Sequence, residues 1–166
     1  MGLRDVSSVQ KVVEELSAQN YLADRGLATA VFLSLRQNRP LLLEGEAGVG
    51  KTELAKSLSN WAEGDLIRLQ CYEGIDSNQA VYEWDYARQL LHLRTAEASG
   101  RTEDVSTDIL EGELYDERFL IRRPLLQALS VKNDPPPVLL IDEIDRADDE
   151  FEAFLLEILS EYSITI

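Results

Sequence analysis

The sequence predicts a three-layer α/β fold around a parallel sheet. Two short apolar runs, residues 41–43 and 138–141, have the length and composition of buried strands. Amphipathic helical patterns lie before, between and after them, and a glycine-rich turn follows the first run. Strands that alternate with helices in this way indicate a parallel sheet covered by helices on both faces. At 166 residues, the chain has room for one such domain, spanning 1–166.

Residues 1–40 are expected to be a helical segment of that same domain. Val9, Val12 and Leu16 recur at helical spacing, and a second amphipathic helix is expected from about Asp24. Pro40 ends the helical pattern, so the apolar run that follows is expected to be the first strand of the sheet.

The middle of the chain alternates between helical and strand patterns. In chain order we expect a helix over 54–62, a strand over 66–72, a helix over 79–98, an exposed acidic insertion over 99–113 and a helix near Pro124.

The C-terminal part contains the second apolar strand and a strong amphipathic helix. Three prolines at 135–137 force a turn before the strand over 138–141. Phe151 begins a helical pattern of apolar residues, and Ile164 and Ile166 resemble the start of another strand.

Composition excludes several classes of function. The formal net charge of −15 opposes binding to a nucleic-acid backbone, and no apolar stretch is long enough to cross a membrane. No signal peptide is visible, which favours a cytoplasmic protein. The single cysteine, Cys71, cannot form an intramolecular disulfide, and we interpret it as a buried strand residue.

The turn GEAGVGKT matches the phosphate-loop pattern G-x-x-x-x-G-K-[ST] and lies between an expected strand and an expected helix, as that pattern requires. Its glycines allow backbone N–H groups to point inward, and the following helix adds its positive N-terminal end. Lys51 is expected to reach the β- and γ-phosphates and Thr52 to bind Mg²⁺. The predicted nucleotide-binding residues of the loop are Gly45, Glu46, Ala47, Gly48, Val49, Gly50, Lys51 and Thr52.

Two carboxylates follow the second apolar run in the sequence VLLIDE. Ligands of open α/β sheets gather at the carboxyl ends of the strands, which is where Asp142 and Glu143 are expected. Downstream of a phosphate loop, Asp142 is predicted to hold the magnesium ion. Glu143 is predicted to act with Lys51 in catalysis by polarising the water that attacks the γ-phosphate of ATP.

The strings GEAGVGKTELAK and LLIDEIDRADDEFEAFLLEILSE resemble the AAA+ ATPases, in particular the MoxR family and its CoxD-like branch. The similarity runs from about Tyr21 to the last residue. It implies ATP and Mg²⁺ as cofactors, self-assembly into rings that are usually hexamers, and remodelling of a protein client, often a metalloenzyme in maturation. It also implies a possible von Willebrand A domain partner and an adenine pocket at Tyr21 and Leu22, for which ordinary helix packing is the alternative.

The same resemblance predicts parts of an AAA+ ATPase that should lie beyond Ile166: a polar sensor on a further strand, an arginine finger and a helical lid. With the usual strand order 5-1-4-3-2, the fourth strand would lie between the first strand and the strand carrying Asp142. The sheet is therefore expected to be incomplete at its C-terminal end, and residues 1–166 alone are expected to be inactive.

Two other functions remain open. Lys132, Asn133 and Asp134 form a K-x-D fragment of the kind found in GTPases, although it precedes a strand where guanine recognition should follow one. A scaffold that binds nucleotide without turnover is the second, and the presence of Glu143 disfavours it.

Several other residues have ordinary structural interpretations. His92 is expected to be structural or exposed, and Trp84 and Tyr86 to be core or interface aromatics. Arg146 is expected to be a solvated or ion-paired surface residue, with contact to a neighbouring subunit as the alternative.

Overall fold

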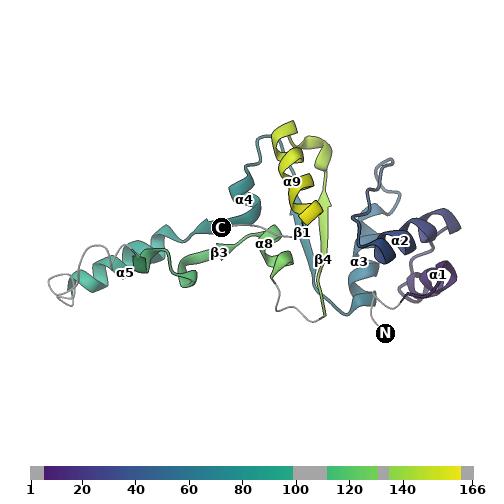
Figure 1. Cartoon of the computed structure of the whole chain (residues 1–166), viewed down its shortest axis with the longest axis horizontal. Helices are drawn as coiled ribbons and strands as arrows, with labels where there is room; N and C mark the ends of the chain where they lie inside the picture. Colours follow the sequence, from purple (N-terminus) through teal and green to yellow (C-terminus); the bar gives the residue numbers. More distant parts are fainter. Residues whose placement is uncertain (1–5, 99–111, 131–134, 162–166) are drawn as a thin grey trace.

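The computed structural model describes residues 6–98, 112–130 and 135–161. Its centre is a parallel pair of strands, β1 (Leu66–Gln70) and β4 (Val138–Asp142), aligned from Leu66 opposite Val138 to Gln70 opposite Asp142. Helices cover both faces of this pair, which confirms the predicted three-layer α/β fold with a parallel sheet (Figure 1).

Helix α3 (Lys51–Ala62) covers one face of the sheet, and α1 (Val9–Ala18) packs on α3 and on α2 (Arg25–Gln37). Helix α2 begins where expected because the Asp24 carboxylate accepts a hydrogen bond from the backbone N–H of Leu27 at 2.7 Å. The buried side chains of these helices form the N-terminal cluster, whose members include Val12, Leu16, Val31, Leu54 and Trp61.

The other face is covered by α4 (Ser77–Val81), α8 (Pro124–Leu129) and α9 (Asp149–Glu161). Pro124 occupies the first turn of α8, where a missing N–H costs no hydrogen bond. Buried side chains between these helices and the sheet form a second cluster, which we call the sheet cluster. Its members include Leu69, Cys71, Leu125, Phe151 and Leu155. The predicted helix after the second apolar strand is thereby confirmed, and the strand expected over 66–72 ends at Gln70.

The expected helix over 79–98 is wrong, because a short strand interrupts it. The chain leaves α4 into β2 (Tyr82–Trp84), which pairs antiparallel with β3 (Leu120–Arg122). Helix α5 (Tyr86–Ala98) then follows β2, and the short 3₁₀ helix η2 (Glu117–Phe119) precedes β3. The aromatic residues of β2 favour a strand once a partner is available, and the Trp84 ring meets those of Tyr82 and Tyr115 edge to face.

These elements form an arm that projects from the sheet (Figure 1). The term arm refers to β2, α5, η2 and β3 together. Residues 99–111 of the expected acidic insertion lie outside the described residues, as do the residues expected to begin a further strand at the C-terminal end.

The expected strand over 41–43 is also wrong, since these residues form no strand pairing. Leu41 and Leu43 pack on the N-terminal cluster while Leu42 is 70% exposed, so the side chains alternate as in an extended chain. A strand needs a hydrogen-bonding neighbour. Among the described residues, β4 has β1 as its single strand neighbour, and all five residues of β4 remain only partly buried.

No helix in the described ranges combines the length and apolar character that crossing a membrane requires.

Candidate nucleotide-binding site

The glycine-rich turn forms an exposed loop that leads directly into α3. Gly48 and Gly50 have φ angles of 83° and 90°, which L side chains rarely adopt. Gly50 is the N-cap residue immediately before α3, so the loop ends at the positive N-terminal end of a 12-residue helix. The sequence places glycine where the loop backbone turns most sharply, and this geometry suits a phosphate group.

Lys51 and Thr52 are the first two residues of α3. The Lys51 ammonium folds back over the loop and donates hydrogen bonds to the carbonyl oxygens of Gly45, at 2.6 Å, and Glu46, at 2.7 Å. A positive charge is therefore held against the turn, and a phosphate bound in the loop would replace those carbonyls as its partner. Thr52 is partly buried in the first turn of the helix.

Tyr21 lies beside the phosphate loop, and Leu22 is turned to solvent. A Cβ atom built on Gly50 would lie 3.6 Å from the Tyr21 ring, so the ring lies close to this turn of the loop and leaves room for one methyl group between them. Burial, and then the charge of Asp24, raises the pKa of Tyr21 above its ordinary value, so its hydroxyl is protonated at neutral pH. Leu22 is 90% exposed.

Asp142 is the last residue of β4, and both of its carboxylate oxygens have partners. Oδ2 lies 2.6 Å from an Arg68 guanidinium nitrogen, and Oδ1 accepts a hydrogen bond from the backbone N–H of Glu143 at 3.1 Å. The same Arg68 nitrogen donates to the Gln70 side-chain oxygen at 2.6 Å. The aspartate predicted to hold magnesium is thus ion-paired with a residue of the neighbouring strand.

Glu143 is held at a turn with an unusual backbone. Its φ of 54° and ψ of 44° put it in the left-handed region, where the backbone of a residue other than glycine is strained by about 1 kcal/mol. Its carboxylate is 2.9 Å from the guanidinium of Arg146, at the end of the 3₁₀ helix η3 (Ile144–Arg146). Arg146 is therefore an ion-paired surface residue, as the first of its two interpretations expects.

The phosphate loop and the two carboxylates belong to neighbouring elements. Helix α3 packs on β4, and Figure 1 shows the loop before α3 and the carboxyl end of β4 at the same end of the molecule. Within the described residues they are connected by this packing and not by a hydrogen bond between Lys51 or Thr52 and the carboxylates.

These residues fit a magnesium ion bound with a nucleotide. Magnesium sites in nucleotide-binding proteins use one or two protein oxygens and complete their coordination with phosphates and water. Thr52 offers a hydroxyl and Asp142 a carboxylate, and no group of three or more metal-binding side chains occurs in the described part of the chain. Two oxygen donors of this kind are what the protein would have to supply to a magnesium ion that it shares with a nucleotide.

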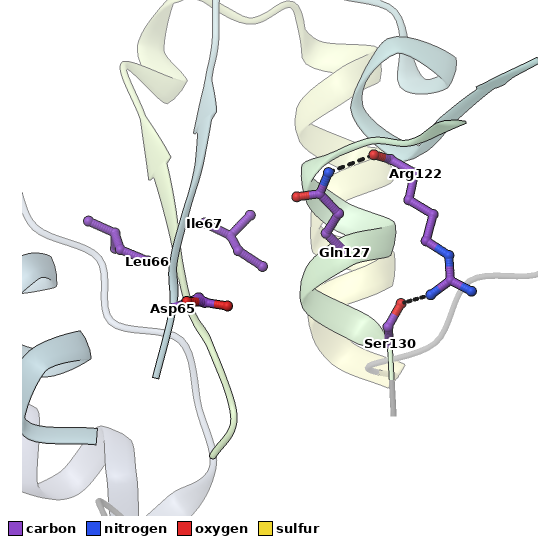
Figure 2. Close-up of a pocket in the computed structure, with 6 residues that line it drawn as sticks. All are labelled: Asp65, Leu66, Ile67, Arg122, Gln127 and Ser130. Carbon is purple, nitrogen blue, oxygen red and sulfur yellow. Dashed lines mark hydrogen bonds between the residues drawn. The ribbon is translucent and has the colours of Figure 1, made fainter. Parts of the chain in front are cut away.

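A hollow of about 450 Å³ lies at the opposite end of β1 (Figure 2). The side of the hollow that faces β1 contains two hydrogen bonds. The Gln127 side chain donates to the Arg122 carbonyl oxygen, and the Arg122 guanidinium donates to the Ser130 hydroxyl (Figure 2). It lies at the amino end of the strand, away from Asp142, and is not part of the nucleotide-binding site. Its lining residues are Asp65, Leu66, Ile67, Arg122, Gln127 and Ser130.

His92 has a structural role, as expected, whereas Cys71 is buried as expected but lies just beyond β1, which ends at Gln70. Cys71 is buried in the sheet cluster, and its backbone N–H donates to the Asp142 carbonyl oxygen at 2.9 Å. His92 lies on α5, 3.0 Å from a Glu113 carboxylate oxygen and with its ring 5.5 Å from that of Phe119. Neither residue belongs to the site.

Sequence reasoning missed Arg68. The alternation of the segment LIRLQ shows that Arg68 shares a face with Gln70, but it does not reveal which residue of another strand lies beside it. That information is the register of β1 against β4, which brings Arg68 beside Asp142, 74 positions later in the chain.

Comparison with protein-family models matches residues 35–166 to a family described as AAA domain. The match covers most of the chain, so this protein belongs to the AAA family of P-loop ATPase domains. Membership indicates nucleotide binding and an ATPase-type activity, typically with Mg²⁺. Comparisons with curated proteins and with solved structures give no significant match.

Proposed function

We propose that this chain binds Mg-ATP and that the whole, assembled protein hydrolyses its β–γ phosphoanhydride bond and uses the resulting conformational change to remodel a protein client in metalloenzyme maturation. The observation that carries the first part is the pairing of two elements. Helix α3, which follows the glycine loop, packs on strand β4, which ends at the carboxylate of Asp142 and is followed by that of Glu143. Phosphoryl transfer depends mostly on positioning and electrostatic stabilisation, which these elements can supply.

Each residue has a distinct role in this proposal. The loop backbone over 45–50 cradles the phosphates, and Lys51 neutralises the charge of the β- and γ-phosphates. Thr52 and Asp142 hold the magnesium ion, which polarises the phosphate oxygens when bound. Glu143 leaves Arg146 and polarises the attacking water, and its left-handed backbone sets the direction of the carboxylate. Tyr21 and Leu22 border the adenine.

The position of Tyr21 supports the last assignment in part. Its ring lies near Gly50, the last residue of the phosphate loop, so a nucleotide bound in the loop could pass beside it. Leu22 is exposed, so it could contact a base without displacing packed neighbours.

We further propose that the chain belongs to the MoxR family, in its CoxD-like branch, and acts as a homohexameric ring with a protein client and a von Willebrand A domain partner. The two strings quoted above support this proposal. We also propose that further sheet strands and a helical lid complete the domain of residues 1–166. Support for the strands is that residues 41–43 run extended without a partner, and that β4 pairs along one edge in the described residues.

A phosphate-release assay tests the function. The full-length, assembled protein is given ATP or GTP with Mg²⁺, and the same protein with Lys51→Ala supplies the background rate. We expect release from ATP above that background and little from GTP. Comparable rates with both nucleotides would favour a GTPase or an unselective enzyme. Tight ATP binding without release by the assembled protein would favour the scaffold, and neither binding nor release would refute the proposal.

A further inference from the structure

We propose that Arg68 is a built-in counterion of Asp142 that competes with magnesium for this carboxylate and so sets the magnesium concentration at which nucleotide binds. This inference rests on the proposed function, because it concerns the same site. It gives a role to a residue that the phosphate-loop and carboxylate motifs do not include.

The first step is the geometry of the ion pair. One guanidinium nitrogen of Arg68 donates to Asp142 Oδ2 and to Gln70 Oε1, each at 2.6 Å. Both N–H groups of that nitrogen are therefore used, and Gln70 fixes the direction in which the guanidinium points. With Oδ1 engaged by the Glu143 N–H, Asp142 has a partner on each oxygen.

The second step is the face on which the pair lies. Side chains alternate along a strand, and Figure 2 shows Leu66 and Ile67 pointing to opposite sides of β1, with Ile67 toward α8. Leu69 and Ile141 belong to the sheet cluster on the α8 side. Arg68 and Asp142, each one position away from them, thus lie on the face covered by α3. Lys51 and Thr52 begin that helix.

The third step is electrostatic. While the guanidinium is bound to Oδ2, its positive charge offsets the negative charge of the carboxylate. The guanidinium therefore opposes the approach of a second cation. The pair is exchangeable, because the Arg68 side chain is 52% exposed and ion pairs in contact with water are weak. The displaced guanidinium would remain on the α3 face, and its planar fork suits phosphate oxygens.

Competition makes a measurable prediction. A fluorescent ATP analogue at fixed concentration is titrated with Mg²⁺, and the midpoint of binding is recorded. Arg68→Gln should lower the midpoint by about three- to tenfold, because the competing charge is gone. Arg68→Lys, which keeps the charge but loses the fork, should give a midpoint between those of the wild type and Arg68→Gln.

Two controls separate competition from a general change in charge. Arg118→Gln removes an arginine on the arm that is also beside an aspartate, Asp116 at 3.9 Å, and should leave the midpoint unchanged. In an Asp142→Asn background, Arg68→Gln should no longer lower the midpoint, because the contested carboxylate is absent. Circular dichroism checks that each variant is folded.

Equal midpoints for the wild type and Arg68→Gln, in folded proteins that bind the analogue, would overturn the competition while leaving the proposed function intact. An equal decrease in Arg118→Gln would do the same, since the effect would then be one of net charge. A wild-type protein that binds no analogue at any magnesium concentration would overturn both proposals.

Discussion

Lys51 supplies the positive charge inside the phosphate loop, and the structure holds it there with two backbone carbonyl oxygens. We expect Lys51→Ala to lower the affinity for a fluorescent ATP analogue by about 100-fold or more, because the loop loses the charge that neutralises a polyphosphate. Lys56→Ala is the matched control. It lies on the same helix, paired with Glu53 at 2.9 Å, and should keep the wild-type affinity. Equal affinities for all three proteins would contradict the assignment of the loop.

Glu143 is expected to act on water and not on the bound nucleotide. Glu143→Gln should therefore bind the ATP analogue nearly as tightly as the wild type while phosphate release falls by about 100-fold or more. Glu150→Gln, an exposed carboxamide substitution near the start of α9, should change neither quantity. A parallel loss of affinity and rate in Glu143→Gln would show that the residue binds the metal or supports the fold.

Cys71 is a buried thiol at the carboxyl end of the sheet, so its reactivity measures how well this end is packed. Burial, followed by the charges of Asp142 and Asp145, raises the pKa of its thiol. The folded state therefore holds the thiol proton to higher pH than the unfolded state. Its contribution to stability is present below the unfolded pKa of about 8.5 and is lost as pH rises through the folded pKa.

Thiol chemistry checks this directly. At pH 8 we expect an aromatic disulfide reagent to react with native Cys71 at least about 100-fold more slowly than with the chain in denaturant, because both burial and the raised pKa suppress the thiolate. Similar rates in the two states would show that the cysteine is accessible.

At the scale of elements, α9 offers a paired test of packing. Leu155 is 1% exposed in the sheet cluster, and the next residue, Leu156, is 70% exposed. Leu155→Ala should lower the free energy of unfolding by about 2–5 kcal/mol, and Leu156→Ala by less than about 0.5 kcal/mol. Urea unfolding curves for both variants measure the difference. Similar losses would show that Leu156 is packed as tightly as Leu155.

The elements that the sequence predicts well are those with a local signal. Helix α9 is visible in the spacing of Phe151, Leu155 and Ile158, and α2 in its Asp24 cap. The segments that it predicts wrongly depend on partners distant in the chain. Residues 41–43 have a strand composition but no strand neighbour, and β2 exists because β3 lies beside it.

The candidate site divides in the same way. The phosphate loop and the Asp142–Glu143 pair are contiguous in sequence, so their residue types suffice to predict them. Arg68, by contrast, reaches Asp142 only through the register of two strands. The left-handed backbone of Glu143 was also not predicted, since glutamate carries no preference for that conformation.

At the scale of the molecule, stability should be uneven. Most residues of α5 in the arm are exposed to solvent, whereas α3 and α9 contribute buried side chains to the N-terminal cluster and the sheet cluster. We expect the amides of α5 to exchange hydrogen with solvent faster than those of α3 and α9, because local opening of α5 uncovers little apolar surface. Hydrogen exchange followed by mass spectrometry measures this order. Equal protection would indicate that the arm is packed against something in solution.

The way the arm joins the sheet has a consequence for how this family could diversify. Tyr82 pairs with Arg122, so the chain leaves for the arm and returns from it at adjacent points. A segment with neighbouring ends can grow, shrink or be exchanged for another without changing the separation of the strands that it interrupts. The nucleotide-binding residues and the arm can therefore evolve separately. The same nucleotide-binding site can be combined with arms of different length and sequence, each suited to a different function.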